Sequence, residues 1–129
     1  MKTKIGLLFM VLAVAGTLMA WTMKESSQVK HVVVFKYKSK ATADEIEQVT
    51  QAFKALKGKI PGIVSLEYGE NNSPEKLNKG FTHIYLLTFE NVAARDAYLP
   101  HAEHKKFGEL LRKLDVLEEP FVVDFQVKE

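Results

Sequence analysis

Four short segments, in which apolar residues dominate and side chains alternate between two faces, predict four β-strands. They span residues 29–37, 63–68, 81–89 and 121–127 and are rich in valine and aromatic residues, which favour strands. In the first segment His31, Val33 and Phe35 share one face, and the two valines between them share the other. Both faces are apolar, so we expect this strand to be covered on both sides.

Apolar residues recur with helical spacing in two of the segments between the strands. The first begins with a capping box at Thr42 and ends with a lysine–glycine pair that is typical of a helix terminus, so its C-terminus is predicted near Lys57. Asn91 can cap a second, short helix that runs through Tyr98. Pro100, whose fixed φ suits a first helical turn, starts the helix again.

The resulting order, β-α-β-β-α-β, is that of the ferredoxin-like α+β fold, with two helices on one face of a four-stranded antiparallel sheet. The opposite face of the sheet also carries apolar residues, including one row of the last strand: Phe121, Val123, Phe125 and Val127. A second copy packed sheet against sheet would cover this face, so we expect a homodimer.

The first 27 residues have the pattern of a signal peptide followed by a linker. Lys2 and Lys4 precede an uncharged apolar segment at residues 5–21, and cleavage is predicted after Ala20. Leu18 matches poorly the small residue that cleavage requires, so an uncleaved membrane anchor at residues 5–21 is the alternative. We therefore expect export to the periplasm or the extracellular space, and one domain at residues 28–129.

Charge and composition exclude several functions. Removing Lys2, Lys4, Lys24 and Glu25 from the 18 basic and 16 acidic residues leaves 15 of each, so the domain has no positive field that would favour nucleic acid. The chain has no cysteine, which excludes a lipid-modified cysteine at the cleavage site. We expect a membrane contact only through an uncleaved leader.

The segment at residues 98–107 concentrates side chains suited to proton transfer. A helix that begins in this segment places His101 and His104 on neighbouring positions of one face, with Tyr98 close to its start. A phenol and an imidazole that line a cavity can act in general acid–base catalysis. The alternative is a structural role, in which His104 bonds Asp124, and His101 is exposed or caps the helix.

Three segments of the chain form a specific combination. They are Val-Lys-His-Val-Val-Val-Phe-Lys-Tyr at 29–37, Gly-Phe-Thr-His-Ile-Tyr-Leu-Leu-Thr-Phe-Glu at 80–90, and the spacing Tyr98-x-x-His101-x-x-His104-x-x-Phe107. Together they resemble the stress-responsive A/B barrel family, often called the Dabb domain, over nearly the whole chain after Gln28. The resemblance implies a ferredoxin-like protomer, a dimeric α/β barrel in which two sheets close together, and no cofactor or metal.

The family includes a plant polyketide cyclase that closes a ring by aldol condensation. By this resemblance His104 matches the catalytic base of that cyclase and Tyr98 its catalytic tyrosine. His31 and His83 match histidines that line its pocket, and Asp124 matches an acidic residue that can orient the base. These are the expected polar groups of the site.

We expect a small apolar ligand between sheet and helices, with Phe35, Phe53 and Tyr85 among the walls of its pocket. Phe53 stands where the cyclase has a tyrosine, and Tyr85 stands where it has a small aliphatic residue. The pocket is therefore bulkier and differently polar than that of the cyclase, and the same substrate is not implied. An exported protein would also not meet a substrate that is made in the cytoplasm.

Several functions stay open from the sequence. The first is binding of a small molecule, and the second is a cofactor-free lyase or cyclase with His104 as base and Tyr98 as stabiliser of an enolate. The third is an interaction protein with a filled core, and fold analogy alone adds a haem-degrading monooxygenase. A metal site formed by His31, His83 and His104 is disfavoured, because the sequence contains no metal-binding spacing.

Overall fold

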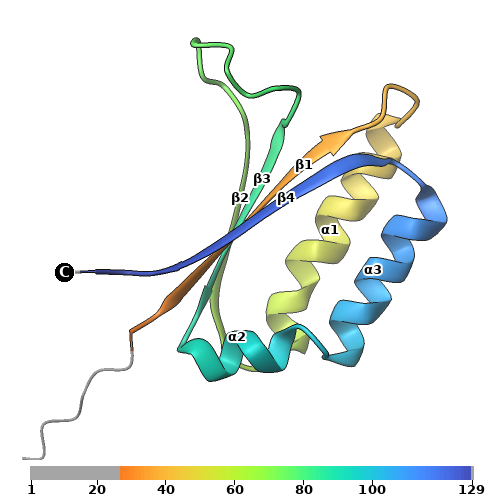
Figure 1. The fold of residues 1–129 in the computed structure, drawn as a ribbon. Coiled ribbons are helices and arrows are strands. Elements are labelled where there is room, and N and C mark those ends of the chain that lie inside the picture. The colour runs from red at the N-terminus through yellow and green to blue at the C-terminus, as the bar shows by residue number, and fades with distance from the viewer. Residues whose placement is uncertain (1–26, 129) are drawn as a thin grey trace, which may run out of the picture.

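The computed structural model describes residues 27–128, which form a four-stranded sheet and three helices. The strands are β1 (Val29–Tyr37), β2 (Ile63–Glu70), β3 (His83–Phe89) and β4 (Leu117–Gln126), and the helices are α1 (Ala43–Lys59), α2 (Val92–Tyr98) and α3 (Ala102–Leu114). All neighbouring strands pair antiparallel in the order β2-β3-β1-β4 (Figure 1). The predicted ferredoxin-like α+β fold is confirmed, with the second helical segment divided into α2 and α3.

The predicted leader at residues 5–21 lies outside the described residues. Within the part of the chain that is described, no helix combines the length and the apolar character needed to cross a bilayer.

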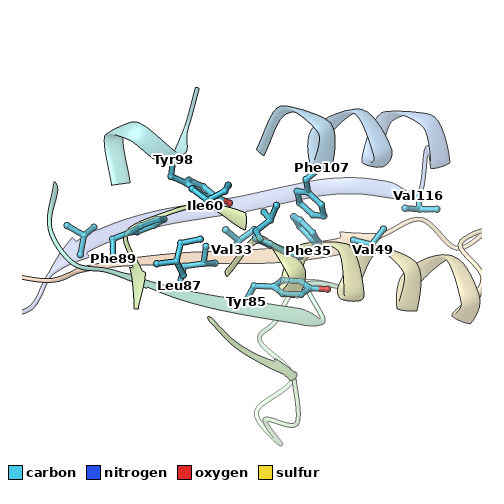
Figure 2. Packing of buried hydrophobic residues seen from close by; sticks show 14 residues of the cluster. Val33, Phe35, Val49, Ile60, Tyr85, Leu87, Phe89, Tyr98, Phe107 and Val116 are labelled. Carbon is cyan, nitrogen blue, oxygen red and sulfur yellow. The ribbon is translucent and has the colours of Figure 1, made fainter. Parts of the chain in front are cut away.

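Helices α1 and α3 run side by side along one face of the sheet, and α2 lies across its end (Figure 1). The core fills the space between these layers and contains fourteen buried apolar residues (Figure 2): Val29, Val33, Phe35, Val49, Phe53, Leu56, Ile60, Ile63, Tyr85, Leu87, Phe89, Tyr98, Phe107 and Val116. Aromatic rings pack at its centre. The ring of Phe53 lies 4.6 Å from that of Phe107 and 4.4 Å from that of Tyr85, measured between centroids.

Helix α1 begins as predicted and ends later. The hydroxyl of Thr42 accepts from the backbone N–H of Glu45 at 3.2 Å, and the carboxylate of Glu45 accepts from the N–H of Thr42 at 2.9 Å, which completes the capping box. The predicted end near Lys57 is wrong, because Gly58 is helical and the helix continues to Lys59. The two additional helical residues precede Ile60, which lies in the core, and the left-handed glycine is Gly62, with φ +88°.

A β-bulge changes which residues of β2 face the core. The register between β2 and β3 shifts between Ile63 and Ser65, so that Ile63 pairs with Phe89 while Leu66 pairs with Leu87. Strict alternation along residues 63–68 predicts that Val64 shares a face with Leu66. This prediction is wrong, because the bulge interrupts the alternation, and Val64 is exposed.

Strand β4 lies at the edge of the sheet and starts three residues before Pro120, earlier than predicted. An edge strand tolerates a proline, because the missing N–H can fall on the unpaired side. The predicted outer row of this strand is confirmed as a row of side chains 41–51% exposed in the protomer: Phe121, Val123, Phe125 and Val127. The sheet face turned away from the helices thus carries apolar side chains without a cover from this chain.

Candidate functional site

A cavity of about 220 Å³ lies between the sheet and the helical layer. Strands β1 and β4, all three helices and the α2–α3 connection contribute to its lining, which consists of His31, Val33, Phe35, Phe53, Tyr98, Leu99, His104, Phe107, Gly108, Leu111 and Val122. The wall is mainly apolar, with two imidazoles and one phenol as its polar groups. A mainly apolar wall with a few convergent polar groups is typical of small-molecule sites.

The structure brings together five of the eight predicted site residues around this cavity. These are His31, Phe35, Phe53, Tyr98 and His104. Asp124 lies behind His31 and bonds it, whereas His83 and Tyr85 lie elsewhere in the core and do not line the cavity. Six residues that were not predicted as site residues complete the wall: Val33, Leu99, Phe107, Gly108, Leu111 and Val122.

The break between α2 and α3 aims Tyr98 and His104 at each other. Helix α2 ends at Tyr98, and α3 is capped by His101, whose Nδ1 accepts from the N–H of Glu103 at 3.1 Å. The cap role of His101 is the structural alternative that the sequence left open. This geometry brings the rings of Tyr98 and His104 together, and their centroids lie 4.4 Å apart.

The hydroxyl of Tyr98 is buried and has no hydrogen-bond partner among the described residues. Burial raises the pKa of this phenol above its ordinary value, and the nearby negative charge of Asp124 raises it further. Tyr98 therefore carries its proton at neutral pH and can donate it in a hydrogen bond. Buried polar groups in native proteins are nearly always paired. Among the described residues the hydroxyl of Tyr37 is also buried and unpaired, but only that of Tyr98 belongs to a residue of the cavity wall.

His104 is oriented by the backbone. Its Nδ1 lies 2.9 Å from the carbonyl oxygen of Leu99, and a carbonyl can only accept, so Nδ1 carries the hydrogen. In the neutral imidazole Nε2 is then a bare acceptor. The expectation that Asp124 orients His104 is wrong, because its carboxylate faces another imidazole.

That imidazole is His31, and Asp124 forms the centre of a three-residue network with His31 and Arg95. Its Nδ1 lies 2.5 Å from Oδ1 of Asp124, while Oδ2 of the same carboxylate accepts from Nη1 of Arg95. Burial alone would raise the pKa of Asp124, but the hydrogen bonds from Arg95 and His31 hold it below its ordinary value. The sequence analysis did not identify Arg95. The feature that could have identified it is its spacing, because a residue three positions before Tyr98 on the same short helix lies on the same face.

The two remaining predicted residues belong to a separate polar cluster in the core. The hydroxyl of Tyr85 lies 2.7 Å from that of Thr50, and the ring of His83 lies 4.9 Å from that of Tyr37. Burial lowers the pKa of His83, which favours its neutral form. His83 therefore does not join the other two histidines, and within residues 27–128 no group of three metal-binding side chains occurs.

Comparison with known families decides the identity of the domain. The profile of the stress responsive A/B barrel domain (Dabb) matches residues 29–127. The chain belongs to this family. The resemblance predicted from the three sequence segments is thereby confirmed.

Three relatives of this Dabb chain illustrate the range of the family. Olivetolic acid cyclase of Cannabis sativa is 31% identical over 84 residues, which cover 65% of this chain and 83% of the cyclase. Hydroxynitrile lyase of Passiflora edulis is 25% identical, with a TM-score of 0.72 over 80% of this chain and 95% of the lyase. A dimeric protein with a ferredoxin-like fold from Bacteroides fragilis is 29% identical, with a TM-score of 0.61 over 78% of this chain and 96% of its own.

Proposed function

We propose that this Dabb protein is an exported homodimer that binds a small, mainly apolar molecule in the cavity between sheet and helices. The observation that carries the proposal is the buried hydroxyl of Tyr98, which has no hydrogen-bond partner within residues 27–128 and belongs to the cavity wall. A ligand oxygen would supply the missing acceptor. A site built to bond such a group rejects analogues that lack it, because the buried hydroxyl would be left unpaired.

The cavity limits the size and chemistry of the ligand. At about 220 Å³ it is smaller than the sites that hold drug-sized molecules, and it suits a ligand of about ten non-hydrogen atoms. The rings of Phe35, Phe53 and Phe107 offer apolar contact to a flat molecule. Tyr98 offers a donor and His104 an acceptor, so a small aromatic ketone or aldehyde with a hydroxyl group fits best.

A homodimer is supported by the sheet face that the helices leave open. Besides the outer row of β4, this face holds a groove of about 430 Å³ whose apolar lining is Val34, Leu77, Phe81, Ile84 and Phe121. An apolar face of this kind is typical of a surface that another protein covers. The dimeric relative from Bacteroides fragilis has the same fold, and a second copy is the occupant that we propose.

Export is proposed from the leader pattern at residues 1–27. Native mass spectrometry of the protein purified from its own host measures the subunit mass, the dimer mass and any retained small molecule together. A full-length subunit in the cytoplasmic fraction would contradict the export proposal.

The binding proposal predicts a tenfold effect at Tyr98. Hydroxyacetophenones, which have ten non-hydrogen atoms, are the probes, and titration followed by NMR measures their affinity. Tyr98→Phe is expected to weaken binding about tenfold, the equivalent of about 1.4 kcal/mol for one hydrogen bond. Tyr68→Phe, outside the cavity, removes a hydroxyl without touching the wall and should leave affinity unchanged. Equal affinities in both variants would refute the role of the Tyr98 hydroxyl, and no binding to the unmodified protein would refute this ligand class.

A second function, that of a cofactor-free lyase or cyclase, is favoured by the placement of Tyr98 beside His104. Nε2 of a neutral His104 would remove a proton from the carbon next to a ketone carbonyl, and the hydroxyl of Tyr98 would donate to the enolate oxygen. The enolate carbon would then attack a second carbonyl, and the resulting alkoxide would take the proton back from His104. Two relatives are named as a cyclase and a lyase, which supports a lyase or cyclase function for this chain.

Proton abstraction can be measured without knowing the natural substrate. In D₂O the methyl group of a bound hydroxyacetophenone is expected to exchange hydrogen for deuterium, and NMR follows the loss of the methyl signal. His104→Gln removes the base and should lower this exchange at least about a hundredfold, whereas His101→Gln should not. If binding occurs but exchange is equal in all three proteins, the protein is a binder and the lyase proposal fails.

A further inference from the structure

Arg95 is a charged residue close to the cavity that neither proposed function uses. It lies on α2, three residues before Tyr98, and its side chain reaches across to β4. It does not line the cavity itself, so its effect on a ligand must pass through Asp124 and His31.

We propose that Arg95 is a positioning residue that acts through Asp124 to hold His31 in the tautomer whose Nε2 accepts a hydrogen bond or a proton from the ligand. The proposal rests on the cavity being the ligand site, and it assigns to this chain a second imidazole acceptor beside that of His104.

The geometry of the network selects one tautomer. His31 on β1 pairs directly with Asp124 on β4 in the register of the sheet, so the two side chains lie next to each other on the face toward the helices. Each carboxylate oxygen has one partner, His31 on Oδ1 and Arg95 on Oδ2. An ionised carboxylate only accepts, so Nδ1 of His31 must carry the hydrogen. Nε2 of the neutral ring is then left as an acceptor.

Arg95 is the group that keeps this arrangement in place. A half-buried carboxyl is driven toward its neutral form by loss of water, and a protonated Asp124 could donate to Nδ1 instead. Nε2 would then carry the hydrogen and could no longer accept. The guanidinium opposes this by bonding Oδ2, and it is itself held by Asp96, whose Oδ1 accepts from Nε at 2.7 Å. On the cavity side the titratable groups near His31 and Asp124 are Tyr98 and His104.

The tautomer can be read directly from ¹⁵N NMR of the imidazoles in the full dimer, at a pH where the rings are neutral. In the unmodified protein we expect Nδ1 of His31 to be protonated and Nε2 to be bare. Arg95→Gln should populate the opposite tautomer and shift the titration of the Asp124 carboxyl, followed by ¹³C, to higher pH. Arg112→Gln removes the same charge from an exposed site on α3 and should match the unmodified protein.

A second variant tests the same idea while keeping Arg95. In Asp124→Asn the guanidinium can bond only the amide oxygen, which turns the NH₂ group toward His31 and should move the hydrogen to Nε2. If His31 keeps the unmodified tautomer in Arg95→Gln, the positioning role of Arg95 is wrong, whatever Asp124→Asn shows. Should Arg95→Gln not fold, an unchanged tautomer in Asp124→Asn refutes the proposal, because Arg95 then has no carboxylate through which to act. These spectra need no ligand, so a failure of the binding proposal with hydroxyacetophenones is distinguishable from a failure here.

Discussion

Phe53→Ala is expected to lower the free energy of unfolding by about 3–5 kcal/mol and to remove the inner wall of the cavity. Phe53 is almost completely buried on α1 and contacts the rings of Phe35, Tyr85 and Phe107. Truncation removes the buried area of one ring and also leaves a void among three others. Since a domain of this size has a total stability of only about 5–15 kcal/mol, the change is large.

Urea denaturation followed by circular dichroism measures this loss, at several protein concentrations because a dimer is stabilised by association. Phe53→Leu is the matched control, which keeps an apolar side chain at the site and should cost about 1–1.5 kcal/mol. A loss below about 1 kcal/mol for Phe53→Ala would mean that the ring does not have the central packing role described here. The enlarged cavity should also accept hydroxylated aromatic ketones with longer side chains.

The sequence alone predicted those features that depend on side-chain periodicity. The two-residue alternation in β1 identified the buried row that includes His31 and Phe35, and the spacing around Pro100 placed Tyr98 near His104. These follow from local backbone geometry, because a strand and a helix each repeat with a fixed period. The open sheet face also follows, since helices in this topology cover only one side.

Features that depend on register and on hydrogen-bond choice were not predictable from the pattern. The bulge in β2 exposes Val64, and only the pairing of two distant strands reveals it. Asp124 had several histidines within plausible reach, and the direct pairing of β1 with β4 decides for His31. His104 takes a backbone carbonyl instead, which no residue pattern encodes. Arg95 escaped notice because a lone arginine on a short helix usually faces solvent.

A double substitution on β4, Val123→Lys with Phe125→Lys, is expected to convert the dimer into monomers. Both side chains lie on the apolar sheet face and are about half exposed in the protomer. Packing sheet against sheet would bury two unpaired ammonium groups, and each buried charge costs several kcal/mol. We expect the dissociation constant to rise at least about a thousandfold, the equivalent of about 4 kcal/mol. Sedimentation velocity across a dilution series measures it.

Val92→Lys is the control, because it adds a lysine at an exposed valine on α2, on the helical side of the sheet, and should leave the dimer intact. The monomeric variant also tests where the ligand site lies. The cavity is already formed within one protomer, so we expect the monomer still to bind hydroxyacetophenones with unchanged affinity. Loss of binding together with the dimer would instead mean that the partner completes the wall, most directly beside Val122, which is half exposed in the protomer. A double variant that stays dimeric would exclude the sheet-to-sheet arrangement itself.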